Sequence, residues 1–186
     1  MIAMGFEYSD FKSENPFLTE SPSRMKHKIF ILFAVASICA GCSTVSPGPV
    51  PNLKVVSPGV FRSGQPPVSA WPGLHDVLGI TRDIKLNGGV DWGALQSDVC
   101  VVYDPISFWR QMIGPTDKQI QLAVTSIGPG TLIHCTHGQD RTGLIVGIYR
   151  REFQGWSKEA AYAEMKANGF HWELVGLWWY WHFKVK

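Results

Sequence analysis

The stretch that decides the fold is GTLIHCTHGQDRTGLIVGIYR, residues 130–150. Its first part, TLIHC at 131–135, is an apolar run that predicts a strand, and RTGLIVGIYRREFQ at 141–154 predicts a helix. Cys135 therefore stands at the carboxyl end of a strand, and Arg141 at the start of the following helix. Ligands of α/β proteins bind at this end of the strands, so both residues are candidates for a functional site.

The five residues between Cys135 and Arg141, THGQD, have the length of an anion-binding loop. Backbone N–H groups in such a loop can surround a tetrahedral anion, and the helix N-terminus adds its positive end. The guanidinium of Arg141 can bind two phosphate oxygens at once. The same positive field favours ionisation of the Cys135 thiol, and a thiolate is a good nucleophile. The segment therefore predicts phosphoryl transfer through Cys135.

The stretch HCTHGQDRTG, residues 134–143, resembles the H-C-x-x-G-x-x-R-T-G signature of the cysteine-dependent protein tyrosine and dual-specificity phosphatases. The resemblance extends over residues 55 to 183 and includes VFRSGQP and GWSKEAAYAEMKANGF. It implies a tyrosine-phosphatase-like fold and hydrolysis of phosphomonoesters through a cysteinyl-phosphate intermediate, with neither metal nor cofactor.

The same resemblance assigns roles to single residues. Cys135 is the nucleophile, Arg141 holds the phosphate oxygens, the Thr142 hydroxyl stabilises the departing thiolate, and His134 orients the loop. The residues expected to surround the phosphate are Thr136, His137, Gly138, Gln139, Asp140 and Arg141.

Phosphatases of this kind also need an acid that protonates the leaving oxygen. Asp104 in VYDPIS follows a predicted strand and should emerge at the same sheet edge as Cys135. Asp140 is the alternative, because some phosphoinositide phosphatases carry an aspartate immediately before the loop arginine. Those loops often contain lysine as well, whereas this loop has His137 and Gln139.

The rest of the chain predicts one α/β domain with a central, mainly parallel sheet flanked by helices. Residues 55–67 predict a short strand and a turn, and Trp71, Leu74, Val77 and Leu78 predict a helix ending at Gly79. Strands are expected at 80–86 and, as a buried central strand, at 98–104, with a short helix at 91–97 between them. Thr116 and Gln119 have capping-box spacing at the start of a helix that runs to Gly128.

Other readings of the cysteines are weaker. A zinc site from His134, Cys135 and His137 is disfavoured because neighbouring residues on a strand point to opposite faces. An inert core thiol at Cys135 would leave the loop arginine without a role. Cys100 is expected to be a small buried side chain, with a reversible disulfide to Cys135 as the alternative.

The sequence from Met25 has the layout of an export signal: Lys26 and Lys28, an apolar stretch at 29–40, and then Cys42. Residues 25–41 resemble a bacterial lipoprotein signal peptide, with Cys42 as the lipidated residue and residues 42–54 as a linker to a phosphatase domain at 55–186. Residues 1–24 are expected to be a non-native, disordered upstream extension. The expected location is the cell envelope, on an outer membrane facing the periplasm.

The composition limits the partners. With 17 Lys and Arg against 15 Asp and Glu, the net charge of +2 is too small to suggest nucleic-acid binding. The expected partner is a phosphorylated protein or small phosphomonoester, acted on by a monomer attached to the membrane by its lipid.

The aromatic C-terminal stretch FHWELVGLWWYWHFK predicts a helix that packs on the sheet through Leu174, Leu177, Trp178 and Trp181, with membrane contact as an alternative.

Three alternative functions stay open on the sequence alone. One is an inositide or inositol phosphate phosphatase that uses Asp140. The others are a catalytically silent phosphate-binding module and a structural envelope lipoprotein with a vestigial enzyme fold.

Overall fold

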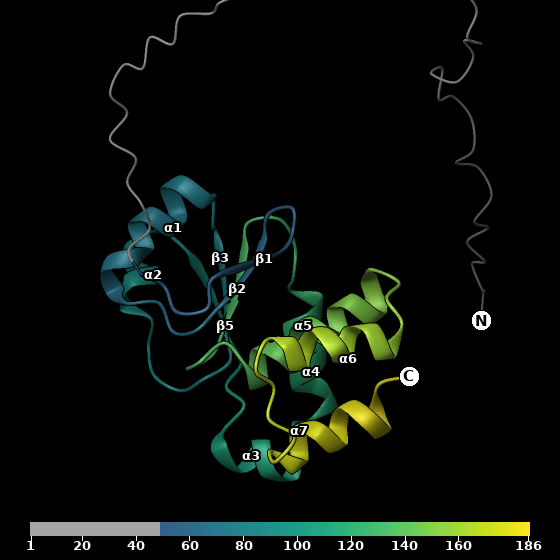
Figure 1. Cartoon of the computed structure of the whole chain (residues 1–186). Helices are drawn as coiled ribbons and strands as arrows, with labels where there is room; N and C mark the ends of the chain where they lie inside the picture. The colour runs from purple at the N-terminus through teal and green to yellow at the C-terminus, as the bar shows by residue number, and fades with distance from the viewer. Residues whose placement is uncertain (1–48) are drawn as a thin grey trace, which may run out of the picture. The chain divides into compact units, whose positions relative to one another are not determined.

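A computed structural model of the chain describes residues 49–186. Five strands form one sheet in the order β1-β2-β5-β3-β4 (Figure 1). All neighbours pair in parallel except β1 and β2, which are antiparallel. The strands are β1 (Lys54–Ser57), β2 (Val60–Ser63), β3 (Arg82–Lys85), β4 (Cys100–Tyr103) and β5 (Thr131–His134). The predicted α/β class with a central, mainly parallel sheet is confirmed.

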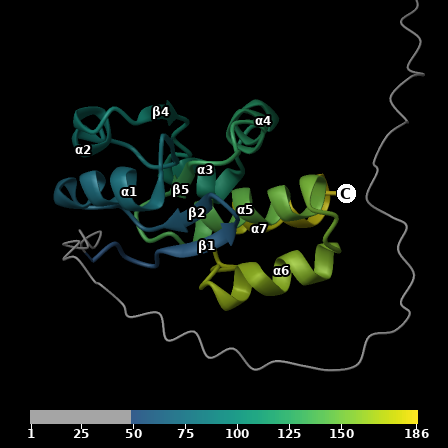
Figure 2. The same ribbon diagram turned by 90° about the horizontal axis from the view of Figure 1, so that it is seen from above.

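Helices cover both faces of the sheet (Figures 1 and 2). They are α1 (Trp71–Leu78), α2 (Trp92–Gln96), α3 (Phe108–Ile113), α4 (Asp117–Thr125), α5 (Asp140–Phe153), α6 (Lys158–Ala167) and α7 (Val175–Trp179), with a 3-10 turn at Val68–Ala70 and a π-helical turn at Tyr180–Lys184. The core on one face joins α1 and α2 to Leu132 of β5. The larger core on the other face joins helices α4 to α7 to Ile133. Adjacent residues of β5 therefore serve opposite cores, as the alternation of a strand requires.

Local signals in the sequence explain several element ends. Gly79 adopts φ 66° and ends α1, because a residue without Cβ adopts this left-handed conformation at little cost. The capping box predicted at Thr116 is present: its hydroxyl accepts from the Gln119 backbone, and the Gln119 side chain accepts from the Thr116 backbone. These contacts satisfy backbone donors at the start of α4, which ends at Thr125, earlier than predicted.

Other expectations were wrong. Residues 55–63 form two strands, because Pro58 and Gly59 turn the chain between β1 and β2. No helix was predicted between residues 104 and 116, but this stretch contains α3, whose first turn is capped by the Ser107 hydroxyl. The strand at β4 was expected at the centre of the sheet and lies at its edge. Its β-branched residues favour a strand but do not determine its neighbours.

Cys100 is exposed and not buried as expected. It lies at the start of β4, in register with Arg82 of β3 and, through it, with Thr131 of β5. Cys135 is two strands away and four residues further along, so the two Cα atoms are about 16 Å apart. A disulfide requires less than about 7 Å, so the proposed Cys100–Cys135 bond does not fit this fold.

The four side chains of the predicted inner stripe do face the core: Leu177 and Trp181 are buried, and Leu174 and Trp178 are half-buried. The neighbours of α7 are the helices α3 and α5, whereas packing on the sheet was expected. Tyr180, which is not part of the predicted stripe, is also buried. Within residues 49–186, no helix combines the length and the apolarity that a bilayer crossing requires. The upstream extension at 1–24, the signal peptide at 25–41 and the lipidation site Cys42 lie outside the described residues.

Candidate active site

The register of the parallel strands brings the predicted site residues to one edge. Lys85 of β3 is aligned with Tyr103 of β4 on one side and with His134 of β5 on the other. One residue further on, Leu86, Asp104 and Cys135 therefore share the next row. Asp104 and Cys135 are two strand spacings apart, about 10 Å between Cα atoms, and leave the sheet on the same face.

The loop after Cys135 is held by hydrogen bonds to its carbonyl groups. The Gln65 backbone N–H binds the Thr136 carbonyl (3.1 Å), Asn52 Nδ2 binds the His137 carbonyl (2.8 Å), and Arg62 Nη2 binds the Gly138 carbonyl (2.8 Å). Three successive carbonyls thus bind partners outside the loop.

The N–H groups of the loop remain available as hydrogen-bond donors. In the described part of the chain, those of Thr136, His137 and Gln139 donate to no other backbone group. The N–H of Gly138 points at the Cys135 sulfur, with N···Sγ at 3.3 Å. Donors that converge on one point form a cradle for an anion.

Gly138 allows the loop to approach the end of β2. It has φ 74°, and a Cβ at this position would lie 2.5 Å from Gly64 N. Any side chain would push the loop away from β2 and break the bonds that orient it. The glycine of the sequence motif thus has a steric reason as well as a conformational one.

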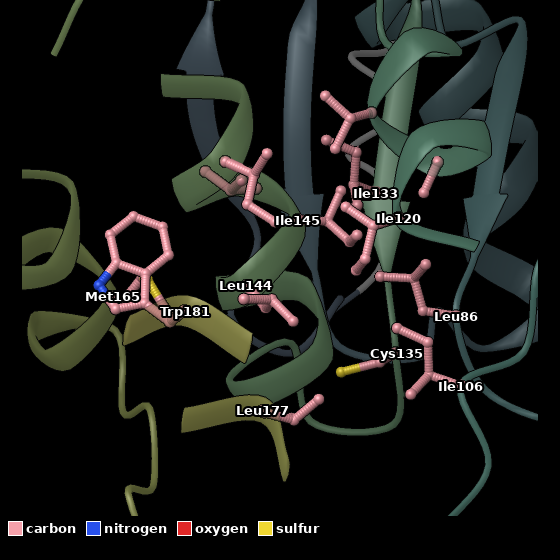
Figure 3. Packing of buried hydrophobic residues seen from close by; sticks show 14 of the residues in the cluster. Leu86, Ile106, Ile120, Ile133, Cys135, Leu144, Ile145, Met165, Leu177 and Trp181 are labelled. Atoms are coloured by element: carbon pink, nitrogen blue, oxygen red, sulfur yellow. The ribbon is translucent and has the colours of Figure 1, made fainter. Parts of the chain in front are cut away.

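Cys135 is buried, with 2 % of its surface exposed. Figure 3 shows it at the end of β5, next to Ile106 and directed toward Leu144 and Leu177. Burial on its own would raise the pKa of the thiol. The hydroxyl and backbone of Thr142, the charge of Arg141 and the Gly138 N–H outweigh burial, and the pKa lies below its ordinary value. These groups favour the thiolate, the form that acts as a nucleophile.

Arg141 extends across the mouth of the loop. Its Nη1 donates to the carbonyls of Ile106 (3.2 Å) and Leu86 (3.4 Å), and its Nη2 to the Thr136 hydroxyl (3.1 Å). Its buried Nε has no partner among the described residues. The guanidinium is therefore fixed in place while retaining a donor for a phosphate oxygen.

Asp104 is buried without a counter-charge, and its Oδ2 has no hydrogen-bond partner among the described residues. Burial raises the pKa of this carboxyl to about 6. Its backbone N–H binds the Lys85 carbonyl (3.0 Å), which continues the β3 ladder and fixes its place in the row. A carboxylic acid with this pKa can donate a proton near neutral pH.

Asp140, the alternative acid, is engaged elsewhere. Its Oδ1 accepts from the backbone N–H of His171 (2.8 Å) and from His171 Nδ1 (3.0 Å). The contact ties the start of α5 to the segment that follows α6. Gln139 lies against the same segment, since a Cβ on Gly169 would meet its side chain.

His134 faces away from Cys135, into a buried charged cluster on the α1/α2 face of the sheet. Its Nε2 is 2.8 Å from Asp91 Oδ2 and 3.1 Å from Asp83 Oδ1. Lys85 Nζ is 3.2 Å from Asp91 Oδ1 and also donates to Gln65 Oε1 (2.7 Å). Gln65 is the residue whose N–H binds the loop, so the cluster supports the loop from behind.

The cluster shifts the ionisation of its members. Burial opposes the charged form of His134, but hydrogen bonds and charges from Asp83 and Asp91 raise its pKa to about 9. For Asp91, burial is outweighed by His134 and Lys85, and its pKa lies well below the usual value. Burial raises the pKa of Asp83.

Asp83, Asp91 and His134 bring three possible metal-ligand atoms within 4.8 Å of one another. The Lys85 ammonium and a protonated His134 already balance the two carboxylates. The cluster thus suits an internal ion network better than a cation site. The zinc trio considered from the sequence is also divided, because His134 and Cys135 point to opposite faces of the sheet.

Sequence reasoning missed Asn52, Arg62, Gln65, Lys85 and Asp91, all of which support the loop or the cluster. A signal in the sequence was available for Asp83 and Lys85. These charged residues lie two positions apart, on one face of a predicted strand, in a sheet expected to be covered by helices on both faces. Charged side chains on a covered face are buried, and buried charges need partners.

No family model matches the chain. Over 53 residues it is 49% identical to the dual specificity protein phosphatase TpbA of Pseudomonas aeruginosa; the match covers 28% of this chain and 23% of the relative. The match thus spans about a quarter of the curated relative's length.

Solved structures extend the similarity beyond this segment. The crystal structure of P. aeruginosa TpbA has 29% identity and a TM-score of 0.59, covering 70% of this chain and 83% of that one. A TpbA variant in complex with phosphotyrosine has 28% identity and a TM-score of 0.60, covering 71% and 83%. The catalytic domain of the PP-IP phosphatase Siw14 from S. cerevisiae, at 18% identity and a TM-score of 0.57, covers 69% and 85% and shares the fold.

The chain thus shares its fold with these phosphatase structures. Among the relatives compared, the similarity in both sequence and structure is to TpbA.

Proposed function

We propose that the chain is a phosphomonoester hydrolase of the protein tyrosine and dual-specificity phosphatase type, with Cys135 as its nucleophile. One observation carries the proposal: the carbonyls of residues 136–138 bind partners outside the loop, while the Gly138 N–H points at Sγ. This arrangement provides a thiolate and an oxyanion cradle in one place before any substrate binds.

In the first step, the Cys135 thiolate attacks phosphorus and forms the S–P bond. The bond to the leaving oxygen breaks, and that oxygen takes the proton of Asp104. The loop N–H groups and the Arg141 guanidinium bind the three equatorial oxygens. The lowered pKa of the thiol and the raised pKa of the carboxyl supply the two protonation states that this step needs.

In the second step, water attacks the cysteinyl-phosphate. The Asp104 carboxylate accepts a proton from the water as the new P–O bond forms, and the S–P bond breaks. The departing thiolate is stabilised by Thr142, which lowers the pKa of Cys135 in the free enzyme as well. Inorganic phosphate then leaves, and the starting protonation states are restored.

Phosphotyrosine is the substrate type that we propose. A relative with 28% identity has been crystallised with phosphotyrosine, which supports this choice. The inositide alternative required Asp140 as the acid, and its carboxylate is bound to His171. The silent module and the vestigial lipoprotein are disfavoured, because the chain retains Cys135, Arg141 and Asp104 and brings all three to one edge of the sheet.

We also propose that the protein is exported and anchored by a lipid at Cys42, on an outer membrane facing the periplasm. The support is the sequence alone: the cationic start at Lys26, the apolar stretch at 29–40 and the small residues before Cys42. Release of a lipid-modified peptide that begins at Cys42 would identify the anchor.

Turnover of p-nitrophenyl phosphate by the full chain tests the activity. We expect turnover by the wild type, complete loss in Cys135→Ser with binding of tungstate retained, and wild-type rates in Cys100→Ser, whose cysteine is exposed at the far end of β4. Tungstate binding without turnover by the wild type would indicate the silent module. Turnover by Cys135→Ser would overturn the mechanism.

A further inference from the structure

Two neighbouring helical segments expose large apolar side chains at one end of the domain. One segment is α3, and the other is α7 with the following π-helical turn; Figure 1 shows α3 and α7 side by side. We call their exposed apolar residues the aromatic face: Phe108, Trp109, Ile113, Val175, Trp179 and Phe183. Trp109 is 72% exposed and Phe183 is 66% exposed, so these rings lie in solvent.

The spacing of these residues gives each segment an apolar outer stripe. Val175, Trp179 and Phe183 recur every four residues, and the rings of Trp179 and Phe183 are 5.7 Å apart. On the inner side of the same segment, Leu177 and Trp181 are buried in the core. A helix that is apolar on both sides needs a second apolar environment besides its own core.

The two stripes are held together at a fixed distance. A Cβ on Gly176 would lie 2.7 Å from Ile113 N, so the helices approach as closely as their backbones allow. A groove of about 330 Å³ runs between them and is lined by Met112, Ile113, Val175, Gly176 and Trp179. The aromatic face is therefore a pre-formed surface with an apolar groove along it.

The two segments carry basic but no acidic side chains. Residues 105–116 and 174–186 contain no Asp or Glu, but they contain Arg110, Lys184 and Lys186. Lys184 and Lys186 lie beside Arg151 and Glu152. The carboxylates that border these segments are Asp104, which is buried, Glu173, and Asp117, which is paired with Lys184 at 3.3 Å. Apolar aromatic residues with basic neighbours are the pattern of surfaces that lie in the headgroup region of a bilayer.

The position of the face fits contact with a membrane. Asn52, near the start of the described part of the chain, lies at the active-site edge of the sheet, where its side chain donates a hydrogen bond to the His137 carbonyl. The same edge leads into α3, because Arg141 binds the carbonyl of Ile106, two residues before α3 begins. Ten residues separate Asn52 from Cys42, a reach of at most about 36 Å. A lipid on Cys42 would keep this edge close to the bilayer.

We propose that the aromatic face binds the surface of an anionic lipid bilayer. The rings of Trp109, Trp179 and Phe183 enter the interface, and the basic residues contact acidic headgroups. A second copy of this chain is a poorer occupant, because two such faces would oppose like charges. The proposal does not depend on the phosphatase activity.

Hydrogen exchange of the full chain, measured by mass spectrometry, tests this proposal. Three samples are compared: the chain alone, the chain with phosphatidylcholine vesicles, and the chain with vesicles that also contain phosphatidylglycerol. We expect exchange at 108–113 and 175–184 to slow several-fold on the anionic vesicles, and exchange at 92–96 in α2 to stay unchanged. The apolar stretch at 29–40 can bind every variant to the vesicles. The readout is therefore which segments are protected from exchange, and not the fraction of the chain that is bound to vesicles.

A double variant, Trp109→Ser with Trp179→Ser, should lose this protection while keeping the thermal melting of the domain. Trp92→Ser is the matched control, since Trp92 is also exposed but lies on α2. Vesicle-bound chain without protection at the aromatic face would overturn the proposal. So would equal protection on neutral vesicles, or protection that appears without lipid as protein concentration rises, which would indicate self-association.

Discussion

Asp140 Oδ1 accepts two hydrogen bonds from His171, one from its backbone N–H at 2.8 Å and one from Nδ1 at 3.0 Å. The contact joins the first residue of α5 to a segment 31 residues further along the chain. It gives Asp140 a role in holding the end of the anion loop. Asp104, by contrast, has a buried oxygen at the edge of the same site for which residues 49–186 supply no hydrogen-bond partner.

Asp104→Asn and Asp140→Asn should therefore affect different steps. Loss of the acid should slow kcat about 10²–10⁴-fold for a substrate with a poor leaving group such as phenyl phosphate. The effect should be much smaller for a good leaving group, which needs little protonation. Asp140→Asn should lower the rates of both substrates alike, because it loosens the loop. A leaving-group dependence that changes in Asp140→Asn and not in Asp104→Asn would reverse the assignment.

The pH profile of kcat/KM should carry the signature of Asp104. The acid acts in its protonated form, so activity should fall as pH rises through its pKa of about 6. Phosphomonoesters also titrate near 6, so the informative quantity is the ratio of wild type to Asp104→Asn at each pH. That ratio should decrease above about pH 6 and approach a constant value. A ratio independent of pH from 5 to 8 would exclude Asp104 as the acid.

The fold class and the centre of the site could be predicted because their signals are local. The strand, loop and helix around Cys135 lie within twenty-five residues, and the capping box at Thr116 spans four. Asp104 was found because a parallel sheet brings the carboxyl ends of its strands to one edge. Each of these inferences needs only the neighbours in sequence or a general rule of α/β folds.

The residues that hold the site in place could not be predicted, because their contacts join parts of the chain that are far apart in sequence. Arg62 binds the carbonyl of Gly138 from 76 residues away, and His134 meets Asp91 across 43 residues. Strand order is a long-range property as well, so the apolar run of β4 gave no sign that it would lie at the edge with Cys100 exposed. Local composition does not determine which strands become neighbours.

The buried cluster should make stability depend on pH. The pKa of His134 is about 9 when folded and about 6.5 when unfolded. Its stabilising effect is therefore fully present below about pH 6.5 and is lost as pH rises through 9. The pKa of Asp91 is lowered, so its own contribution is present above about pH 4 and is lost at lower pH.

Denaturation between pH 6 and 10 measures this effect, with Cys135→Ser as the background so that the thiol does not titrate. Stability should decline through pH 9. Adding Asp91→Asn should cost about 3–5 kcal/mol at neutral pH, because it breaks a buried pair, and should flatten the decline. An unchanged decline in the double variant would show that Asp91 does not control the ionisation of His134.

Gly138→Ala should lower stability and activity by more than the strain of its positive φ alone would. Gly155 has a similar positive φ of 69°, but no atom of the described chain lies within 4 Å of a Cβ built there, so Gly155→Ala should cost only about 1–2 kcal/mol. Gly138→Ala has the same strain plus a clash with Gly64, and it should cost more stability and abolish turnover. Urea denaturation and aryl phosphate turnover of the two variants make the comparison. Equal costs would mean that the loop does not need its close approach to β2.

The most direct test of the mechanism is to trap the intermediate. The full chain is mixed with p-nitrophenyl phosphate, quenched in acid within one turnover, and digested for mass spectrometry. We expect one phosphoryl group on Cys135 in the wild type, its accumulation when Asp104→Asn slows its hydrolysis, and none in Cys135→Ser. Turnover without phosphate on Cys135 at any quench time, or phosphate on another residue, would contradict the proposal that this cysteine is the nucleophile.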